Sequence, residues 1–306
     1  MRDRPRSRPA RRAGGRKPVP LRDALFAAIY KVYSGFSGRR FMTDLEDGGA
    51  AGHVSKAPHY NFIFKALEDE ATGPILRDMV ARSSLPLRGV EINFAIDSSG
   101  FSSSKFERWF DTKYGVDRKR AAWVKTHLCV GVETQVVASV EIGDAHDSKM
   151  LPDLLRVAAK NFPVRDVLAD KAYRSMTNVE FIADEGGTPF IPPKVGSKAD
   201  REGEARRKMF HLFAANRDEF LRRYHQRSNV ESAFSMIKRK FGDAVRSKTT
   251  TAMANEVLAK IVCHNVVCCI HAAHELGIDM GPGFGGEKRE GPGGGDAPRL
   301  IRFPGS

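Results

Sequence analysis

Cysteine, tryptophan and long apolar runs are scarce in this sequence of 306 residues. It has four cysteines, two of them adjacent, and this is a poor disulfide framework for so long a chain, which favours a reducing cytoplasm. The longest apolar stretches are interrupted within a dozen residues, and the first 20 residues are rich in Arg and Pro. Neither a membrane span nor a secretory signal is therefore expected.

Acidic residues are also in the minority. The chain has 50 Lys and Arg against 37 Asp and Glu, which gives a formal charge of +13 at pH 7. Such an excess predicts positive surface potential and makes phosphate-rich partners the first class to consider. Hydrophobic residues make up 41% of the chain, enough for the core of one large domain or two ordinary ones, so a disordered protein is excluded.

Both ends of the chain differ in composition from the rest. Residues 2–17 carry eight Arg or Lys among Pro and Gly, so residues 1–20 are expected to be a disordered basic arm. Such an arm either lies along DNA or is a solvated tail, and composition favours neither. Residues 277–306 are rich in Gly and Pro and are expected to form a flexible tail.

Residues 21–85 show apolar positions at helical spacing, over 21–33, around 41–45 and over 62–79. We interpret this region as a set of short helices. A helix-turn-helix-like module that docks on duplex DNA is slightly preferred to a helical cap on the next domain.

From residue 90 the pattern changes to short segments typical of strands, separated later by helices. Their order is β-β-β-α-β-α-β, over residues 90–97, 121–133, 134–144, 148–161, 166–170, 176–186 and 188–193. Three antiparallel strands followed by β-α-β crossovers predict an α/β fold, with an RNase H-like mixed five-stranded sheet flanked by helices over residues 86–276.

Two acids stand at the expected ends of predicted strands. Asp97 ends the first strand and is followed by Ser-Ser-Gly, and Asp170 ends the fourth and is followed by Lys171. In such sheets ligands bind at the carboxyl ends of central strands, so the pair is expected to lie at one edge. One such acid alone is weak evidence, because loops are solvated.

A third acid lies in a helix expected to begin near Ser228. If the helix extends backward, Tyr224, Arg227, Glu231 and Lys238 share one face, beside an apolar stripe that would hold the helix against the sheet. A solvated Arg-Glu pair at i,i+4, worth about 0.3 kcal/mol, is the plainer interpretation of Arg227 and Glu231 in isolation.

Three carboxylates at one sheet edge can hold two Mg²⁺ ions about 4 Å apart, with Mn²⁺ as a substitute, and this arrangement suits phosphodiester displacement. Arg227, Lys238 and Lys171 would then contact the adjacent phosphates.

Together these motifs resemble the DDE transposases of bacterial insertion sequences. Tyr224-x2-Arg227-x3-Glu231-x6-Lys238 matches the Tyr-Arg-Glu-Lys signature of that family at every spacing. AIDSSGF resembles its first Asp motif, LADKAYRS its second, and AHDSKMLPDLL the segment that precedes the second Asp. The resemblance covers roughly residues 20–275.

The resemblance implies that Asp97, Asp170 and Glu231 are the metal-binding catalytic triad of an enzyme that cuts transposon ends and joins the freed 3′-hydroxyl to target DNA. It implies that Tyr224, Arg227 and Lys238 contact phosphates near the transposon end. The implied partners are terminal inverted repeats, target DNA and a second subunit in a synaptic homodimer, in the cytoplasm and associated with the nucleoid. Ala172 stands where relatives often have Gly, and the segment between Asp170 and Glu231 is too short for a large β-rich insertion domain, so a hairpin-forming mechanism is not expected.

Two other functions remain open: a transposase-derived DNA-binding protein that no longer cuts, and an RNase H-fold nuclease without strand transfer. Three local features have competing interpretations. The Cys and His residues of 263–274 are expected to be apolar helix packing rather than a zinc site. His146-Asp147 is expected to be a helix-capping turn at Asp147 or Ser148 rather than a general base pair. Trp109 and Trp123 are candidates for base stacking, with Trp123 expected in the core.

Overall fold

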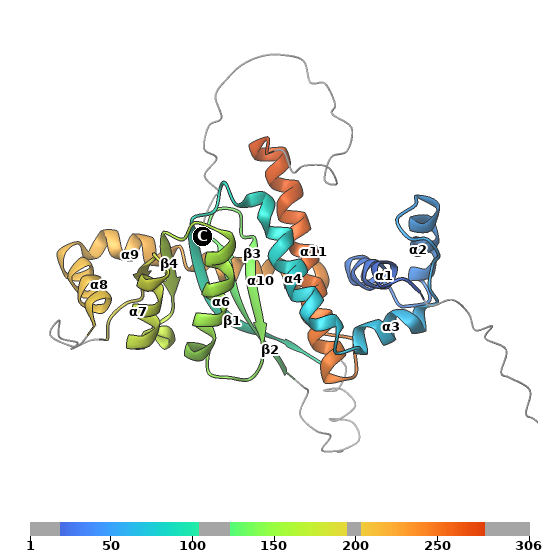
Figure 1. The fold of residues 1–306 in the computed structure, drawn as a ribbon, viewed down its shortest axis with the longest axis horizontal. Helices are drawn as coiled ribbons and strands as arrows, with labels where there is room; N and C mark the ends of the chain where they lie inside the picture. Colours follow the sequence, from blue (N-terminus) through green and yellow to red (C-terminus); the bar gives the residue numbers. More distant parts are fainter. Residues whose placement is uncertain (1–18, 104–122, 195–202, 279–306) are drawn as a thin grey trace, which may run out of the picture.

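The structure, a computed structural model, describes residues 19–103, 123–194 and 203–278. Nearly all of the predicted basic arm and C-terminal tail, together with Trp109, lies outside the described residues. The fold places a sheet at the centre, with helices α1–α3 at one end and α7–α9 at the other (Figure 1).

A five-stranded mixed sheet has the order β3-β2-β1-β4-β5. β1 pairs with β2 and β2 with β3 antiparallel, whereas β4 pairs with β1 and β5 with β4 in parallel. The strands are β1 (Asn93–Ser102), β2 (Trp123–Gly131), β3 (Val137–Ile142), β4 (Asp166–Ala169) and β5 (Thr188–Phe190). The predicted fold class is confirmed, because the three apolar alternating segments pair as a meander and the crossovers add parallel strands beyond β1.

Helices cover both faces of the sheet. The helices between β3 and the last helix are α6 (Asp147–Asn161), α7 (Met176–Asp184), α8 (Glu204–Ala215), α9 (Arg217–His225) and α10 (Ser228–Phe241). The Ser98 hydroxyl donates to Asp147 of α6, while the Ser99 hydroxyl accepts from Lys238 of α10. Successive side chains of a strand point to opposite faces, so α6 and α10 lie on opposite faces of β1, and Asp97 shares the α10 face with Ser99.

The N-terminal region forms four helices, α1 (Leu21–Ser34), α2 (Phe41–Ala50), α3 (Tyr60–Glu68) and α4 (Thr72–Ser84), followed by a 3₁₀ turn, η1 (Leu85–Leu87). The single helix predicted over 62–79 is thus two helices, because the chain turns at Asp69, whose backbone is extended. α1, α2 and α3 share a small core, with Phe41, Leu45 and Ile63 fully buried, and α4 instead joins the main core through Leu76 and Val80.

The last helix, α11 (Thr250–Leu276), ties these parts together. It packs against α1, α3, α4 and α10 and runs beside α4 in Figure 1. By length and composition it is apolar enough to cross a membrane, but 67% of its most apolar window is buried within the fold. A buried fraction of this size is typical of a helix that packs in the core of a fold.

Two strand predictions need correction. Asp97 does not end β1, because the strand continues to Ser102 through antiparallel pairing with β2. Trp123 is 58% exposed rather than buried in the core. Its indole lies over Gly100, where an added Cβ would be only 2.0 Å from the ring.

Candidate active site

Asp97 and Asp170 lie side by side where two parallel strands part. The pairing of β1 with β4 ends at Ile96 and Ala169, so the next residue of each strand is one of the two acids. β4 stops there and turns into the 3₁₀ turn η2 (Lys171–Tyr173), while β1 continues alongside β2. The sheet edge predicted from the sequence therefore exists, although only Asp170 follows a strand end.

Glu231 reaches this edge from the first turn of α10. The apolar stripe of α10 is buried as predicted, with Val230 and Ile237 fully covered, and this packing places the helix against β1 and β2. The helix does not extend back to Tyr224, which lies on α9. A turn at Gln226 and Arg227 separates the two helices, and it holds Arg227 directly before α10.

Arg227 joins two of the acids. Its Nη1 donates to Asp97 Oδ2 at 2.6 Å, and its Nη2 donates to Glu231 Oε1 at 2.7 Å. Arg227 and Asp97 are about one-fifth exposed, whereas Glu231 is 57% exposed. The planar guanidinium fork suits such a two-carboxylate contact, and it fixes α10 to the sheet at the position of Asp97.

Tyr224 completes the link to the second Asp. Burial raises the pKa of the Tyr224 hydroxyl, Arg227 lowers it, and Asp170 raises it, so the hydroxyl lies beside both side chains. The structure thus brings Asp97, Asp170, Glu231, Tyr224 and Arg227 into one group.

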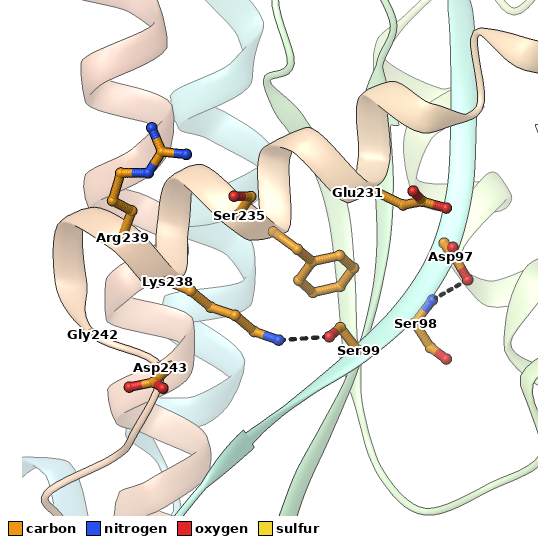
Figure 2. A pocket seen from close by; sticks show the side chains of 10 residues that line it. Asp97, Ser98, Ser99, Glu231, Ser235, Lys238, Arg239, Gly242 and Asp243 are labelled. Carbon is orange, nitrogen blue, oxygen red and sulfur yellow. Dashed lines mark hydrogen bonds between the residues drawn. The ribbon is translucent and has the colours of Figure 1, made fainter. Parts of the chain in front are cut away.

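Lys238 lies two turns along α10 from Glu231. Its Nζ donates to Ser99 Oγ at 2.7 Å (Figure 2). The same Nζ lies 5.5 Å from the centre of the Phe101 ring. Asp97, Glu231 and Lys238 line one open cavity of about 720 Å³, the remaining lining residues being Ser98, Ser99, Phe234, Ser235, Arg239, Gly242 and Asp243. In Figure 2 Glu231 points toward Asp97 at one end of this cavity and Lys238 lies at the other. The cavity therefore carries carboxylates at one end and an ammonium group at the other.

The electrostatics of Asp97 reflect its acidic neighbours. Burial raises the pKa of this carboxyl, Glu231 and Asp170 raise it further, and the Ser98 amide and Arg227 oppose them. The net direction is upward, and burial is its largest cause.

The donor set fits a hard divalent cation in chemistry, since carboxylate oxygens are its preferred ligands. In the described part of the chain, however, no three His, Cys, Asp or Glu side chains are arranged so that they could hold a metal ion. Arg227 bridges Asp97 and Glu231, so a cation that uses both carboxylates requires the guanidinium to turn away.

The other sequence candidates are not members of this group of five side chains. Lys171 is exposed on η2 directly after Asp170. Cys263, His264 and Cys268 are buried in α11 among its packing contacts, and among the described residues they belong to no group of three that could hold a metal ion. The expected cap of α6 is wrong in detail, because His146 rather than Asp147 or Ser148 is the N-cap, and its Nδ1 accepts from the Ser148 amide at 3.3 Å.

Sequence reasoning missed the two serines that follow Asp97, treating them only as small. The Ser98 amide donates to Asp97 Oδ1 at 2.8 Å, and Ser99 holds Lys238. Asp147 was expected to belong to a capping turn rather than to a general base pair, whereas it contacts Ser98 from the opposite face. The sequence feature that could have indicated this contact is Asp147 itself, the acid of the AHDS segment.

Comparison with known proteins gives one family. A family model described as the transposase DDE domain matches residues 89–266, more than half of the chain, and includes Asp97, Asp170 and Glu231. No curated protein matches the sequence.

Proposed function

The chain belongs to the transposase DDE domain family, and on that premise we propose that it cuts DNA at transposon ends and joins them to target DNA. The observation that carries the proposal is the convergence of Asp97, Asp170 and Glu231 from β1, the end of β4 and α10, with Arg227 bonded to two of them. An isolated surface Arg-Glu pair does not account for this, because Arg227 also reaches across 130 residues of sequence to Asp97.

Members of this family generally use divalent metal ions. We assign Asp97, Asp170 and Glu231 as the residues that would hold Mg²⁺, with two ions as the expected number and Mn²⁺ as a substitute. Bound there, the ions supply Lewis acidity that activates the attacking oxygen and stabilises charge on the leaving one.

The proposed reaction has two displacements at phosphorus. In the first, water attacks the phosphodiester at the transposon end; the bond from phosphorus to the 3′-oxygen breaks, leaving a 3′-hydroxyl and a 5′-phosphate. In the second, that 3′-hydroxyl attacks a target phosphodiester, loses its proton, and displaces the target 3′-oxygen, which takes up a proton. No covalent link to the protein forms.

The basic side chains position DNA in this proposal. Arg227 and Lys238 stand at opposite sides of Glu231 on one helix and its preceding turn, and Lys171 follows Asp170, so phosphates on both sides of a scissile bond have cations within reach. Tyr224 offers a hydroxyl beside Asp170. Residues 21–85 would bind terminal inverted repeats, and the protein would act as a homodimer in the cytoplasm, on nucleoid DNA.

The test uses labelled DNA that carries the flanks of the gene. The wild-type protein, Glu231→Gln, and Glu275→Gln as an exposed control on α11 are incubated with Mg²⁺ or EDTA, and breaks and joined products are mapped. We expect metal-dependent cuts and joined ends with wild type and the control. Glu231→Gln should bind the DNA but leave it intact, because it loses a ligand charge and keeps the phosphate contacts.

Cuts without joined products would replace the proposal by the nuclease alternative. Binding without cleavage by wild type would replace it by the DNA-binding protein that no longer cuts.

A further inference from the structure

A fourth carboxylate, Asp147, stands beside the proposed site and has no part in the function proposed above. It is the first residue of α6 and is partly buried on the face of the sheet opposite α10. Because His146 caps the helix, the Asp147 carboxylate is not used for capping. Its oxygens instead face the strands.

Three side chains from β1 and β2 converge on one oxygen of Asp147. Lys125 Nζ lies 2.6 Å from Oδ1, Ser98 Oγ donates to it at 3.1 Å, and the buried His127 Nδ1 lies 3.6 Å away. Lys125 also donates to the Ala145 carbonyl at 3.2 Å, which holds the chain just before the helix. These contacts fix the start of α6 relative to both strands.

The first consequence concerns Asp97. Ser98 is held by Asp147 through its hydroxyl, and it donates its backbone amide to Asp97 Oδ1 at 2.8 Å. The residue that orients the Asp97 carboxylate is therefore itself anchored to α6.

The second consequence concerns Asp170. Asn178 is only 2% exposed. Its Nδ2 donates both to the Ser148 carbonyl at 2.8 Å and to the Tyr173 carbonyl at 3.0 Å. Tyr173 belongs to η2, and its amide donates to the Asp170 carbonyl at 2.9 Å. The first turn of α6 thus holds the turn after Asp170 as well as the residue after Asp97.

We propose that Asp147 is a positioning residue that, through Ser98 and the first turn of α6, sets the separation of Asp97 and Asp170 for cation binding. The inference rests on the proposed function, since it takes those two acids as cation ligands. Residues that orient ligands from outside the coordination sphere typically change metal affinity by about 10- to 100-fold when removed.

The experiment measures free Mn²⁺ by electron paramagnetic resonance during titration of the full-length protein. Asp147→Ala is compared with wild type, with Ser98→Ala, and with Asp153→Ala. The last removes an exposed carboxylate of the same helix, which pairs with Arg156 one turn on. We expect Mn²⁺ affinity to fall about tenfold in Asp147→Ala, to fall in the same direction in Ser98→Ala, and to stay at the wild-type value in Asp153→Ala.

Thermal melting of the same samples separates positioning from helix stability. An acid in the first turn also stabilises a helix, so a lower melting temperature with wild-type Mn²⁺ affinity would overturn the inference. Ser98→Ala removes one half-buried hydroxyl from a strand held by its backbone ladder, so it tests the inference even if Asp147→Ala does not fold. If Glu231→Gln binds Mn²⁺ as tightly as wild type, the proposed ligands are wrong and the inference falls with the proposed function.

Discussion

The Arg227 guanidinium donates to the Asp97 carboxylate across 130 residues of sequence, with Nη1 and Oδ2 at 2.6 Å. The same side chain holds Glu231, so one cation compensates two acids that the proposed reaction assigns to metal ions. Arg227 then has two roles that exclude each other at any one moment, as a counterion for the acids and as a phosphate ligand.

Replacing Arg227 by Gln should change two affinities in opposite directions. Mn²⁺ should bind more tightly than to wild type, because the acids repel each other and no guanidinium competes for them. DNA should bind more weakly, with a salt slope smaller by about one, because one phosphate contact is lost. Electron paramagnetic resonance and DNA titrations at several salt concentrations measure the two effects. Arg222→Gln is the control, since Arg222 is exposed and paired with Glu219 on its own helix; unchanged Mn²⁺ affinity in Arg227→Gln would contradict the competition.

Removing the charge of Asp97 should stabilise the fold at neutral pH. Burial raises the pKa of Asp97 in the folded protein above the ordinary value of 3.8. As pH rises above that value, the folded protein keeps this proton longer than the unfolded chain does. The stability of the fold therefore decreases as pH rises through the folded-state pKa. Asp97→Asn keeps an oxygen for the Ser98 amide and Arg227 but carries no charge. We expect its melting temperature to exceed that of wild type by about 2–4 °C at pH 7, the effect of about 1 kcal/mol in a domain of this size. The gain should shrink as pH falls and the wild-type carboxylate takes up its proton, and a constant gain across pH would argue against this cause.

Lys260 should make stability depend on pH in the alkaline range. It is 1% exposed on α11, donates to the Gly242 and Ala244 carbonyls, and burial lowers its pKa from 10.5 to about 8. Between these two values the unfolded chain binds more protons than the folded protein does. The contribution of Lys260 to the free energy of unfolding therefore increases with pH. Lys260→Met should lose about 1–3 kcal/mol near pH 7, because two carbonyls lose their donor. The difference from wild type should grow from pH 8 to pH 10 in urea denaturation, and a difference that shrinks over that range would refute the assignment.

The four cysteines should be inert in the folded protein. All are buried, and burial raises the pKa of Cys129, Cys263 and Cys268 to about 12 and that of Cys269 to about 11. Only the thiolate reacts, so a chromogenic disulfide reagent at pH 8 should label native protein very slowly and all four thiols in urea. Zinc should be absent from the purified protein, and rapid native labelling or stoichiometric zinc would contradict this packing.

The order of strands and helices could be predicted because each element has its own local periodicity. The position of Asp97 within β1 could not, because Ser98, Ser99 and Gly100 have the composition of a loop. Their strand conformation comes from pairing with β2, whose residues lie far along the chain. Trp123 was misplaced for the same reason: the β1–β2 ladder continues beyond β4, and its end leaves an aromatic side chain exposed over Gly100.

The candidate site was predictable as a set of residues but not as a set of contacts. Helical spacing relates Arg227 to Glu231, since both lie close together in sequence. It says nothing of Arg227 with Asp97, or of Asp147 with Lys125, because those pairs depend on how α10 and α6 dock on the sheet. The turn at Gln226 also breaks the assumed continuous helix, and Arg227 keeps its contacts because it lies within that turn.

The packing of α11 has a consequence for how the protein is made. The helices α1, α3 and α4, which leave the ribosome early, rest against the helix that is synthesised after all the strands of the sheet. Lys260 of that helix also anchors the carbonyls that follow α10, which carries Glu231. A nascent chain that stops before residue 250 therefore lacks both the partner of its first helices and the support of α10, so the proposed site would be complete only once the helix has been synthesised.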